Sequence, residues 1–214
     1  AVTETWRCRD EPLLPLYKPP TEAGRYDPYP AFPLGVGKLR VGFEALAKAL
    51  APYRFVLMDG EVGVFWEEMR QRLDTALRQL RLDVRWLPTQ VALRPSAELE
   101  RMLAPFIGND DPVFGRLFDG QLRDFFDPAK WTTFRPDPSA DLTIVYGCGA
   151  ALASREGVVV WVEVPKNEVQ ARARPGRVIP LGAERPLPFR ATYKRLYFVD
   201  WGALRRHKNS LLPH

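Results

Sequence analysis

RFVLMDGEVGVFWEEMRQRLDTALRQL, residues 54–80, predicts a buried strand, a glycine turn and an amphipathic helix in direct succession. The apolar run over residues 54–58 is too short for a helix, and Asp59 and Gly60 end it abruptly. From Phe65 onward the apolar residues recur at spacings of three and four, so they share one face of a helix: Met69, Leu73, Leu77 and Leu80. A strand joined to a helix by a tight turn is a building unit of α/β domains.

The glycine turn has the layout of a nucleotide-binding phosphate loop without the side chains that bind phosphate. Such a loop needs glycines for close approach of the backbone, a Lys that reaches the outer phosphates, and a Ser or Thr that binds magnesium. The segment GEVGVFW keeps Gly60 and Gly63 but has Val64, Phe65 and Trp66 where those side chains should stand. A tight strand-to-helix turn is therefore favoured over nucleotide catalysis.

More strands are expected further along the chain, with helices between them. The strand segments are residues 82–87, 142–146, 158–164 and 195–199. The helical segments are residues 43–50, 95–103, 121–126, 165–174 and 201–212. Nearly continuous apolar strands separated by helices indicate a parallel sheet of about five strands that helices cover on both faces, which is a three-layer α/β/α domain.

The first 40 residues are rich in proline and predict an extended arm, packed on a single α/β domain that spans residues 41–214. Within the arm, YDPYPAFPLG (residues 26–35) mixes aromatic residues with prolines. Rings in such a segment usually pack onto a neighbouring surface, and capping of a ligand is the less favoured alternative.

Composition and charge indicate a globular, cytoplasmic protein. Of the 214 residues, 46% are hydrophobic, which is enough for a sizeable core. The net charge of +5 is spread along the chain, so nucleic-acid binding is not expected. Cys8 and Cys148 support neither a disulfide framework nor a zinc site. No apolar stretch approaches the ~20 residues that cross a membrane, and the N-terminus does not resemble a signal peptide, so we expect a soluble protein.

Several segments taken together carry a family resemblance: YDPYPAFPLG, DGEVGVFWEEM, DDPVFG, IVYGCGAAL, VEVPKNEVQAR and KRLYFVDWGALRRHKNSLL. They resemble the N-terminal region of some long bacterial class I mannose-6-phosphate isomerases, over about residues 26–212. The resemblance implies a fold similar to the P-loop nucleoside kinases, with uridine kinase nearest in appearance and the strand order 2-3-1-4-5. It also implies a candidate partner, because a metal-dependent cupin isomerase domain follows this region in the long proteins.

The histidines do not support a cupin metal centre within this chain. Such a centre needs several His, Glu or Gln ligands around one divalent ion. The chain has only His207 and His214, and it has no HxH pair. We therefore predict no metal site and no isomerase activity for this chain by itself.

A phosphate or ligand site is the main functional candidate in the predicted fold. In an open parallel sheet, ligands bind beyond the carboxyl ends of the strands, where the loops 59–65 and 147–149 would converge. Glycine amides, a helix N-terminus and arginine side chains would bind the anion. The candidate residues are Asp59, Gly60, Glu61, Gly63, Gly147, Gly149, Arg172, Arg174 and Lys208. Glycines that only close tight turns are the favoured alternative.

The charges around these loops point in two directions. Asp59 and Glu61 would repel a phosphate, and they could instead hold magnesium or accept a hydrogen bond from a sugar hydroxyl. Arg172, Arg174 and Arg177 resemble the arginine-bearing lid segment of P-loop kinases, although a solvated helix end explains them equally well. Without a P-loop Lys, phosphate binding would be weak and sensitive to salt.

Two functions from different classes fit the sequence. The first is a non-catalytic, degenerate P-loop-kinase-like domain associated with mannose-6-phosphate isomerase in sugar phosphate metabolism, which binds a small phosphorylated ligand or an isomerase domain and needs no cofactor. The second is an active nucleoside or sugar kinase with an atypical phosphate loop, for which a nucleotide with magnesium would be the cofactor. The missing Lys and Ser or Thr favour the first function, whereas only the topology and the arginine cluster favour the second.

Overall fold

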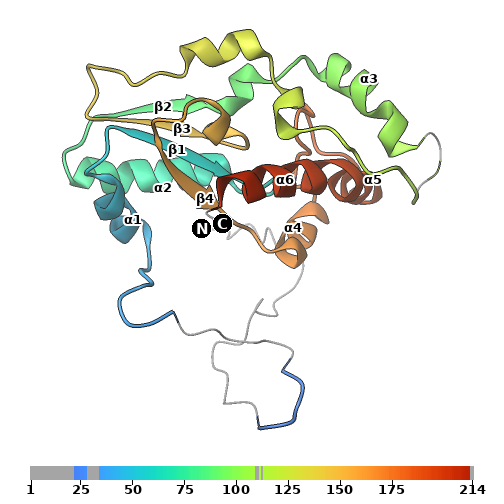
Figure 1. The fold of residues 1–214 in the computed structure, drawn as a ribbon, viewed down its shortest axis with the longest axis horizontal. Coiled ribbons are helices and arrows are strands. Elements are labelled where there is room, and N and C mark those ends of the chain that lie inside the picture. The colour runs from blue at the N-terminus through green and yellow to red at the C-terminus, as the bar shows by residue number, and fades with distance from the viewer. Residues whose placement is uncertain (1–21, 28–33, 109–110, 112, 213–214) are drawn as a thin grey trace.

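A four-stranded, entirely parallel sheet forms the centre of the structure (Figure 1). The computed structural model describes residues 22–27, 34–108, 111 and 113–212. The strands are β1 (Phe55–Gly60), β2 (Val84–Pro88), β3 (Leu142–Tyr146) and β4 (Val158–Val162). Their spatial order is β2-β3-β1-β4, and Leu57 of β1 is in register with Val145 of β3 and Val159 of β4. The expected parallel sheet is confirmed, with β1 inside it.

Helices and 3-10 turns connect the strands. The described residues form α1 (Phe43–Leu50), α2 (Trp66–Gln79), α3 (Ser96–Ile107), α4 (Lys166–Ala173), α5 (Phe189–Arg195) and α6 (Trp201–Leu211). The 3-10 turns are η1 (Thr89–Ala92), η2 (Leu122–Phe125), η3 (Pro128–Thr133) and η4 (Ala150–Leu152). The helix expected over residues 121–126 is therefore a single 3-10 turn. No helix in the described ranges has both the length and the apolar character needed to cross a membrane.

Helices cover both faces of the sheet because the side chains of a strand point alternately to opposite faces. On one face, Val56 and Met58 of β1 pack with Leu73 of α2. On the other face, Leu57 belongs to a larger core that includes Leu99 of α3. Burial of one such side chain contributes ~1.5–3 kcal/mol, so the two cores hold three layers together.

The fifth expected strand, over residues 195–199, is wrong, because this segment is helical. It lies in the π-helical turn η5 (Leu196–Asp200), which joins α5 to α6 and makes the chain helical from Phe189 to Leu211 (Figure 1). The β-branched and aromatic residues of RLYFV favour a strand by local propensity. However, the buried residues recur at helical spacings through the whole segment: Leu196, Val199, Ala203 and His207. Packing of this one face decides the outcome.

Most of the predicted N-terminal arm lies outside the described residues, including the greater part of YDPYPAFPLG. In the described part, residues 34–41 are exposed, and Val36 and Val41 are almost completely so. Tyr26 is also exposed. The packing of the other aromatic rings of the arm stays a prediction.

Candidate ligand-binding site

The carboxyl ends of β1, β2 and β3 surround a cavity of about 320 Å³. The chain after β1 leads to β2 at one edge of the sheet, whereas the chain after β3 crosses β1 to reach β4 at the other edge. Connections that diverge in this way open a crevice beyond the strand ends, where open α/β sheets bind ligands. Side chains of the cavity wall include Val64, Trp66, Thr89, Tyr146, Cys148 and Leu181.

Residues 177–184, which we call the strap, form one wall of the cavity and are fastened by a buried ion pair. Arg195 Nε donates to Asp200 Oδ1 at 3.0 Å, and Arg195 Nη2 donates to the Leu181 carbonyl at 2.7 Å. The Leu181 amide donates to Asp200 Oδ2 at 3.3 Å, and Ser96 Oγ donates to Glu184 at 2.7 Å. Burial raises the pKa of Asp200, and the charge of Arg195 opposes that rise. The helical segment expected to be a strand thus positions the cavity wall.

Next to the cavity, the carboxyl group of Asp59 is completely buried and surrounded by hydrogen-bond donors. Its Oδ1 accepts from the amides of Gly60 and Gly149, each at 2.7 Å, and its Oδ2 accepts from the Ala151 amide at 2.9 Å. His207 Nε2 on α6 lies 2.7 Å from the same Oδ2. Amides that converge in this way form the type of cradle that binds anions. Here a side chain of the protein fills the cradle.

Other amides of the two glycine turns are also used within the protein. The Glu61 amide donates to the Val162 carbonyl at 3.2 Å. In the second turn, the Gly147 amide donates to the Met58 carbonyl at 3.1 Å, and the Ala150 amide donates to Gly147 at 3.1 Å. Most backbone donors of the two turns therefore have partners before any ligand arrives.

Close packing explains why glycines occupy these turns. A Cβ atom on Gly60 would lie 2.3 Å from the Val162 carbonyl oxygen, and one on Gly147 would lie 2.3 Å from Thr89 Oγ1. Gly147 also has a φ of 120°, which residues other than glycine rarely adopt. Packing within the protein therefore explains the presence of glycine at both positions without any ligand.

Arg172 holds α4 against the turn after β1. Its Nη1 donates to the Gly63 carbonyl at 2.6 Å, and its Nε donates to Glu168 Oε1 at 3.0 Å. The guanidinium carbon lies 4.3 Å from the centre of the Phe65 ring. Arg172 therefore lies close to the predicted loop but contacts its carbonyl side.

The other predicted cations have partners elsewhere. The Arg174 guanidinium lies 4.9 Å from the centre of the Phe189 ring, and Lys208 forms an ion pair with Glu163. The structure brings Asp59, Gly60 and Gly149 together, but Arg174 and Lys208 contact residues outside that cluster. An anion site made of both turns and these cations stays a prediction.

Glu61 is buried among charged side chains. Burial raises its pKa, and the nearby Glu163 raises it further, whereas Lys208 and Lys166 lower it.

Among the side chains that the structure describes, no three His, Cys, Asp or Glu residues are grouped so that they could hold a metal ion.

Cys148 lies in the cavity wall, and its thiol is buried. Burial raises the pKa of this thiol well above its usual range, and the charges of Asp59 and Asp200 raise it further. The thiolate is the nucleophilic form of cysteine. Cys148 is therefore a wall residue and not an activated nucleophile at neutral pH.

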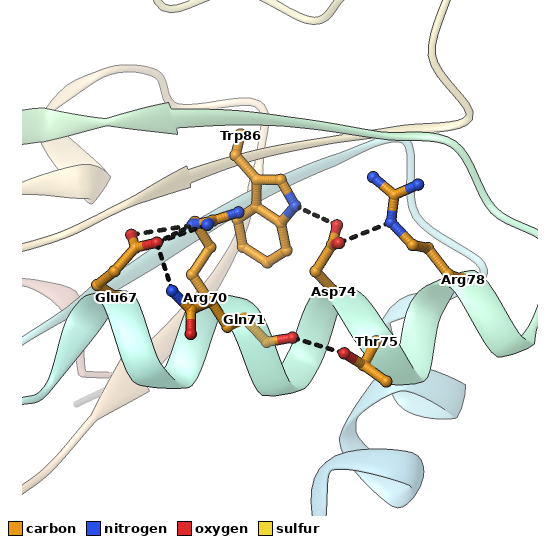
Figure 2. Close-up of polar contacts among 7 residues, drawn as sticks. All are labelled: Glu67, Arg70, Gln71, Asp74, Thr75, Arg78 and Trp86. Carbon is orange, nitrogen blue, oxygen red and sulfur yellow. Dashed lines mark hydrogen bonds and ion pairs between the residues drawn. The ribbon is translucent and has the colours of Figure 1, made fainter.

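Glu67, in the first turn of α2, places a carboxylate at the cavity. Arg70 donates to it through Nη2 at 2.5 Å and through Nε at 2.9 Å, and these bonds lower the pKa of Glu67 to about 2. Figure 2 shows that this pair belongs to a row of polar contacts along α2, where Asp74 accepts a hydrogen bond from Trp86 of β2 at 2.8 Å. The row fixes α2 against β2 and so fixes the position of Glu67.

Sequence reasoning did not find the contact between Asp59 and His207, nor the strap. Asp59 and His207 are 148 positions apart, and no spacing pattern connects them. The available signals were that Asp59 follows a buried strand and that His207 shares a helix face with Ala203 and Leu204. Neither signal shows that the two elements meet.

Comparison with known proteins places the chain in a domain family. No curated protein and no solved structure matches it. The family described as Domain of unknown function (DUF8485) matches residues 42–214, a range that includes the whole sheet, the Asp59 cluster and the cavity. The chain therefore belongs to the DUF8485 family of domains of unknown function.

Proposed function

We propose that this chain is a kinase-like α/β domain without phosphotransfer activity, and that it acts as a binding module beside a mannose-6-phosphate isomerase in sugar phosphate metabolism. The observation that carries the proposal is the position of Asp59, whose carboxyl group accepts hydrogen bonds from the Gly60 amide at the first glycine turn and from the Gly149 and Ala151 amides at the second. Phosphoryl transfer depends on amides and cations that hold the outer phosphates. In this chain the amides of Gly60, Gly149 and Ala151 bind a side chain of the protein, and no Lys, Ser or Thr occurs in the three residues after Gly63.

The strand order supports the kinase-like part of the proposal. The order β2-β3-β1-β4 agrees with the first four strands of the order that the family resemblance implies. The cavity also lies at the carboxyl ends of the strands, where a ligand is expected. Because one fold serves many functions, the proposed loss of phosphotransfer rests on Asp59 and not on the sheet.

An active small-molecule kinase with an atypical phosphate loop is the second candidate, and the cavity beside the turn favours it. Such an enzyme would need a cation at the transferred phosphate, and Arg172 is the nearest predicted candidate to the turn after β1. Arg172 is already bonded to Gly63 and Glu168. Because Arg172 already has these partners, we favour the binding module over the active kinase.

A phosphotransfer assay separates the two candidates. The purified chain is incubated with ATP and magnesium, with uridine or mannose as acceptor, and phosphate release and phosphorylated product are measured. We expect no turnover above that of the double variant Arg172→Ala, Arg174→Ala. The matched control replaces the exposed residues Arg185 and Arg190 by Ala. Turnover that the control keeps and the first double variant loses would establish the active kinase.

The isomerase partnership has a separate test. A purified cupin domain of a class I mannose-6-phosphate isomerase is titrated into the chain in a calorimeter, with an unrelated cupin protein as control. We expect binding of the isomerase domain alone. Equal heats for the two cupins would contradict the partnership with the isomerase. The proposal would then be limited to a module that binds a small molecule in its cavity.

A further inference from the structure

We infer that the cavity between β1, β2, β3 and the strap takes an uncharged aromatic ring compound and excludes phosphate esters. The inference rests on the proposed role as a binding module and specifies the ligand class of that module. It follows from the walls of the cavity, from the charges at its wall, and from the polar groups that remain for a ligand.

The walls are mainly apolar and carry aromatic rings from two parts of the chain. Trp66 begins α2 and Tyr146 ends β3, and both are partly exposed, whereas the Phe126 ring is completely buried. The Tyr146 ring is held edge-on against Trp86 with 5.6 Å between ring centres, so its position is set by the fold. Rings that are held in fixed positions favour a flat, apolar partner that can stack or meet them edge to face.

The charges at the wall disfavour an anion. Glu67 and Glu184 contribute two carboxylates, and Arg177 contributes the only guanidinium among the described lining residues. Glu67 is ion-paired with Arg70, which lowers its pKa to about 2. The Glu184 carboxylate opposes Arg177, and the amides of Gly60 and Gly149 that could bind a phosphate are bonded to Asp59.

Two polar side chains remain to orient an uncharged ring. Thr89 is buried in the wall, and Gln90 lies beside it. Within the described residues, no hydrogen bond of the protein occupies the Thr89 hydroxyl or the Gln90 side-chain amide. A carboxamide can donate and accept at once, so this pair suits a neutral ring that carries both a donor and an acceptor.

Three small probes of similar size test the ligand class. Benzamide is an uncharged aromatic ring, benzoate is its anionic counterpart, and cyclohexanecarboxamide is uncharged without an aromatic ring. Binding is measured by ligand-observed NMR at low and moderate salt. We expect benzoate to bind at least about tenfold more weakly than benzamide, which corresponds to about 1.4 kcal/mol. We expect cyclohexanecarboxamide to bind about threefold more weakly, because it cannot stack on the rings.

Variants locate the probe in the cavity. Val64→Trp fills the cavity and should abolish benzamide binding, whereas Val159→Trp, on β4 outside the lining residues, should keep it. Gln90→Ala changes an exposed side chain and should weaken binding about fivefold without affecting the fold, so the test does not depend on Val64→Trp folding. The double variant Glu67→Gln, Glu184→Gln should narrow the difference between benzoate and benzamide.

Several outcomes would overturn the inference. They are benzoate binding as tightly as benzamide, cyclohexanecarboxamide binding as tightly as benzamide, no benzamide binding at all, or unchanged binding in Gln90→Ala. None of these outcomes produces ATP turnover, so each would remove the ligand class while leaving the proposed lack of phosphotransfer intact. ATP turnover in the phosphotransfer assay would remove the proposed function instead.

Discussion

The Asp59 cluster and the cavity lie at the same edge of the sheet, yet the protein itself fills the first and leaves the second open. Both are built on the turns after β1 and β3. In the cluster, the amides of Gly60, Gly149 and Ala151 converge on one carboxyl group, whereas rings and aliphatic side chains line the cavity. A glycine turn at a strand end therefore does not mark an anion site by itself, because a neighbouring carboxyl group can take its donors.

The largest effect is expected for Asp59→Ala, which empties the filled cluster. The change leaves the amides of Gly60, Gly149 and Ala151, together with His207, without their acceptor. Each unsatisfied buried group costs ~1–3 kcal/mol, so we expect the free energy of unfolding to fall by at least about 4 kcal/mol. Urea denaturation measures the loss.

Acetate sharpens this test, because it offers the carboxyl group that the variant lacks. At equal ionic strength, acetate should stabilise Asp59→Ala more than chloride does, and it should not do so for the wild type. Asp119→Ala, at an exposed position, is the control and should stay within about 0.5 kcal/mol of the wild type. If Asp59→Ala lost no more than this control, the cluster would not be the filled cradle described above.

The next largest effect is expected for Arg195→Ala, which releases the wall of the open cavity. The change leaves Asp200 buried without its cation and the Leu181 carbonyl without its donor. Breaking a buried ion pair in this way costs about 3 kcal/mol. Urea denaturation measures the cost, and benzamide binding should fall with it because the strap lines the cavity.

A double variant separates two contributions to this cost: the lost attraction between Arg195 and Asp200, and the burial of the Asp200 charge without its partner. Replacing Arg195 by Met and Asp200 by Leu removes both charges, and it should recover part of the stability that Arg195→Ala loses. Equal losses in the single and double variants would show that the Asp200 carboxyl is not stranded by removal of Arg195.

A smaller effect is expected from a matched pair of glycines, one within the strap and one just before it. Gly182 and Gly176 have φ values of 78° and 75°, so alanine at either position costs ~1 kcal/mol of backbone strain. A Cβ atom on Gly182 would lie 2.1 Å from Leu99 Cδ1, whereas one on Gly176 would be 3.8 Å from its nearest contact, in Pro186. We expect losses of about 2 and about 1 kcal/mol in thermal unfolding. Equal losses would mean that the strap does not pack tightly on α3.

The smallest effect is expected for Glu61→Gln, beside the filled cluster. Burial and the charge of Glu163 raise the pKa of Glu61, so the folded state binds its proton more tightly than the unfolded state. Glu61 therefore stabilises the fold below its unfolded pKa, and this contribution is lost as the pH rises through the folded pKa. Glutamine does not titrate, so Glu61→Gln does not lose this stability as the pH rises. The free energy of unfolding of the variant, relative to that of the wild type, should therefore increase from pH 4 to pH 7. Parallel stability curves would contradict the raised pKa.

Local patterns were sufficient for most of the sheet. Residues 142–146 were expected as a strand and form one with the same bounds, because a short apolar run is followed there by glycines. The run that begins the opening segment forms β1, and its bounds shift only to Phe55–Gly60. The strand predicted over residues 195–199 was wrong because strand propensity and helical burial compete in RLYFV. Only contact with the core shows which one prevails.

The sequence by itself determined that this chain is an α/β protein with glycine turns at its strand ends and without the side chains of a working phosphate loop. Those properties depend on residue type and short spacing, which a linear chain displays directly. Only the tertiary structure decided what fills the turns and what remains open. His207 reaches Asp59 across 148 positions, and the strap closes the cavity through Arg195 and Asp200, since these contacts depend on how distant elements pack.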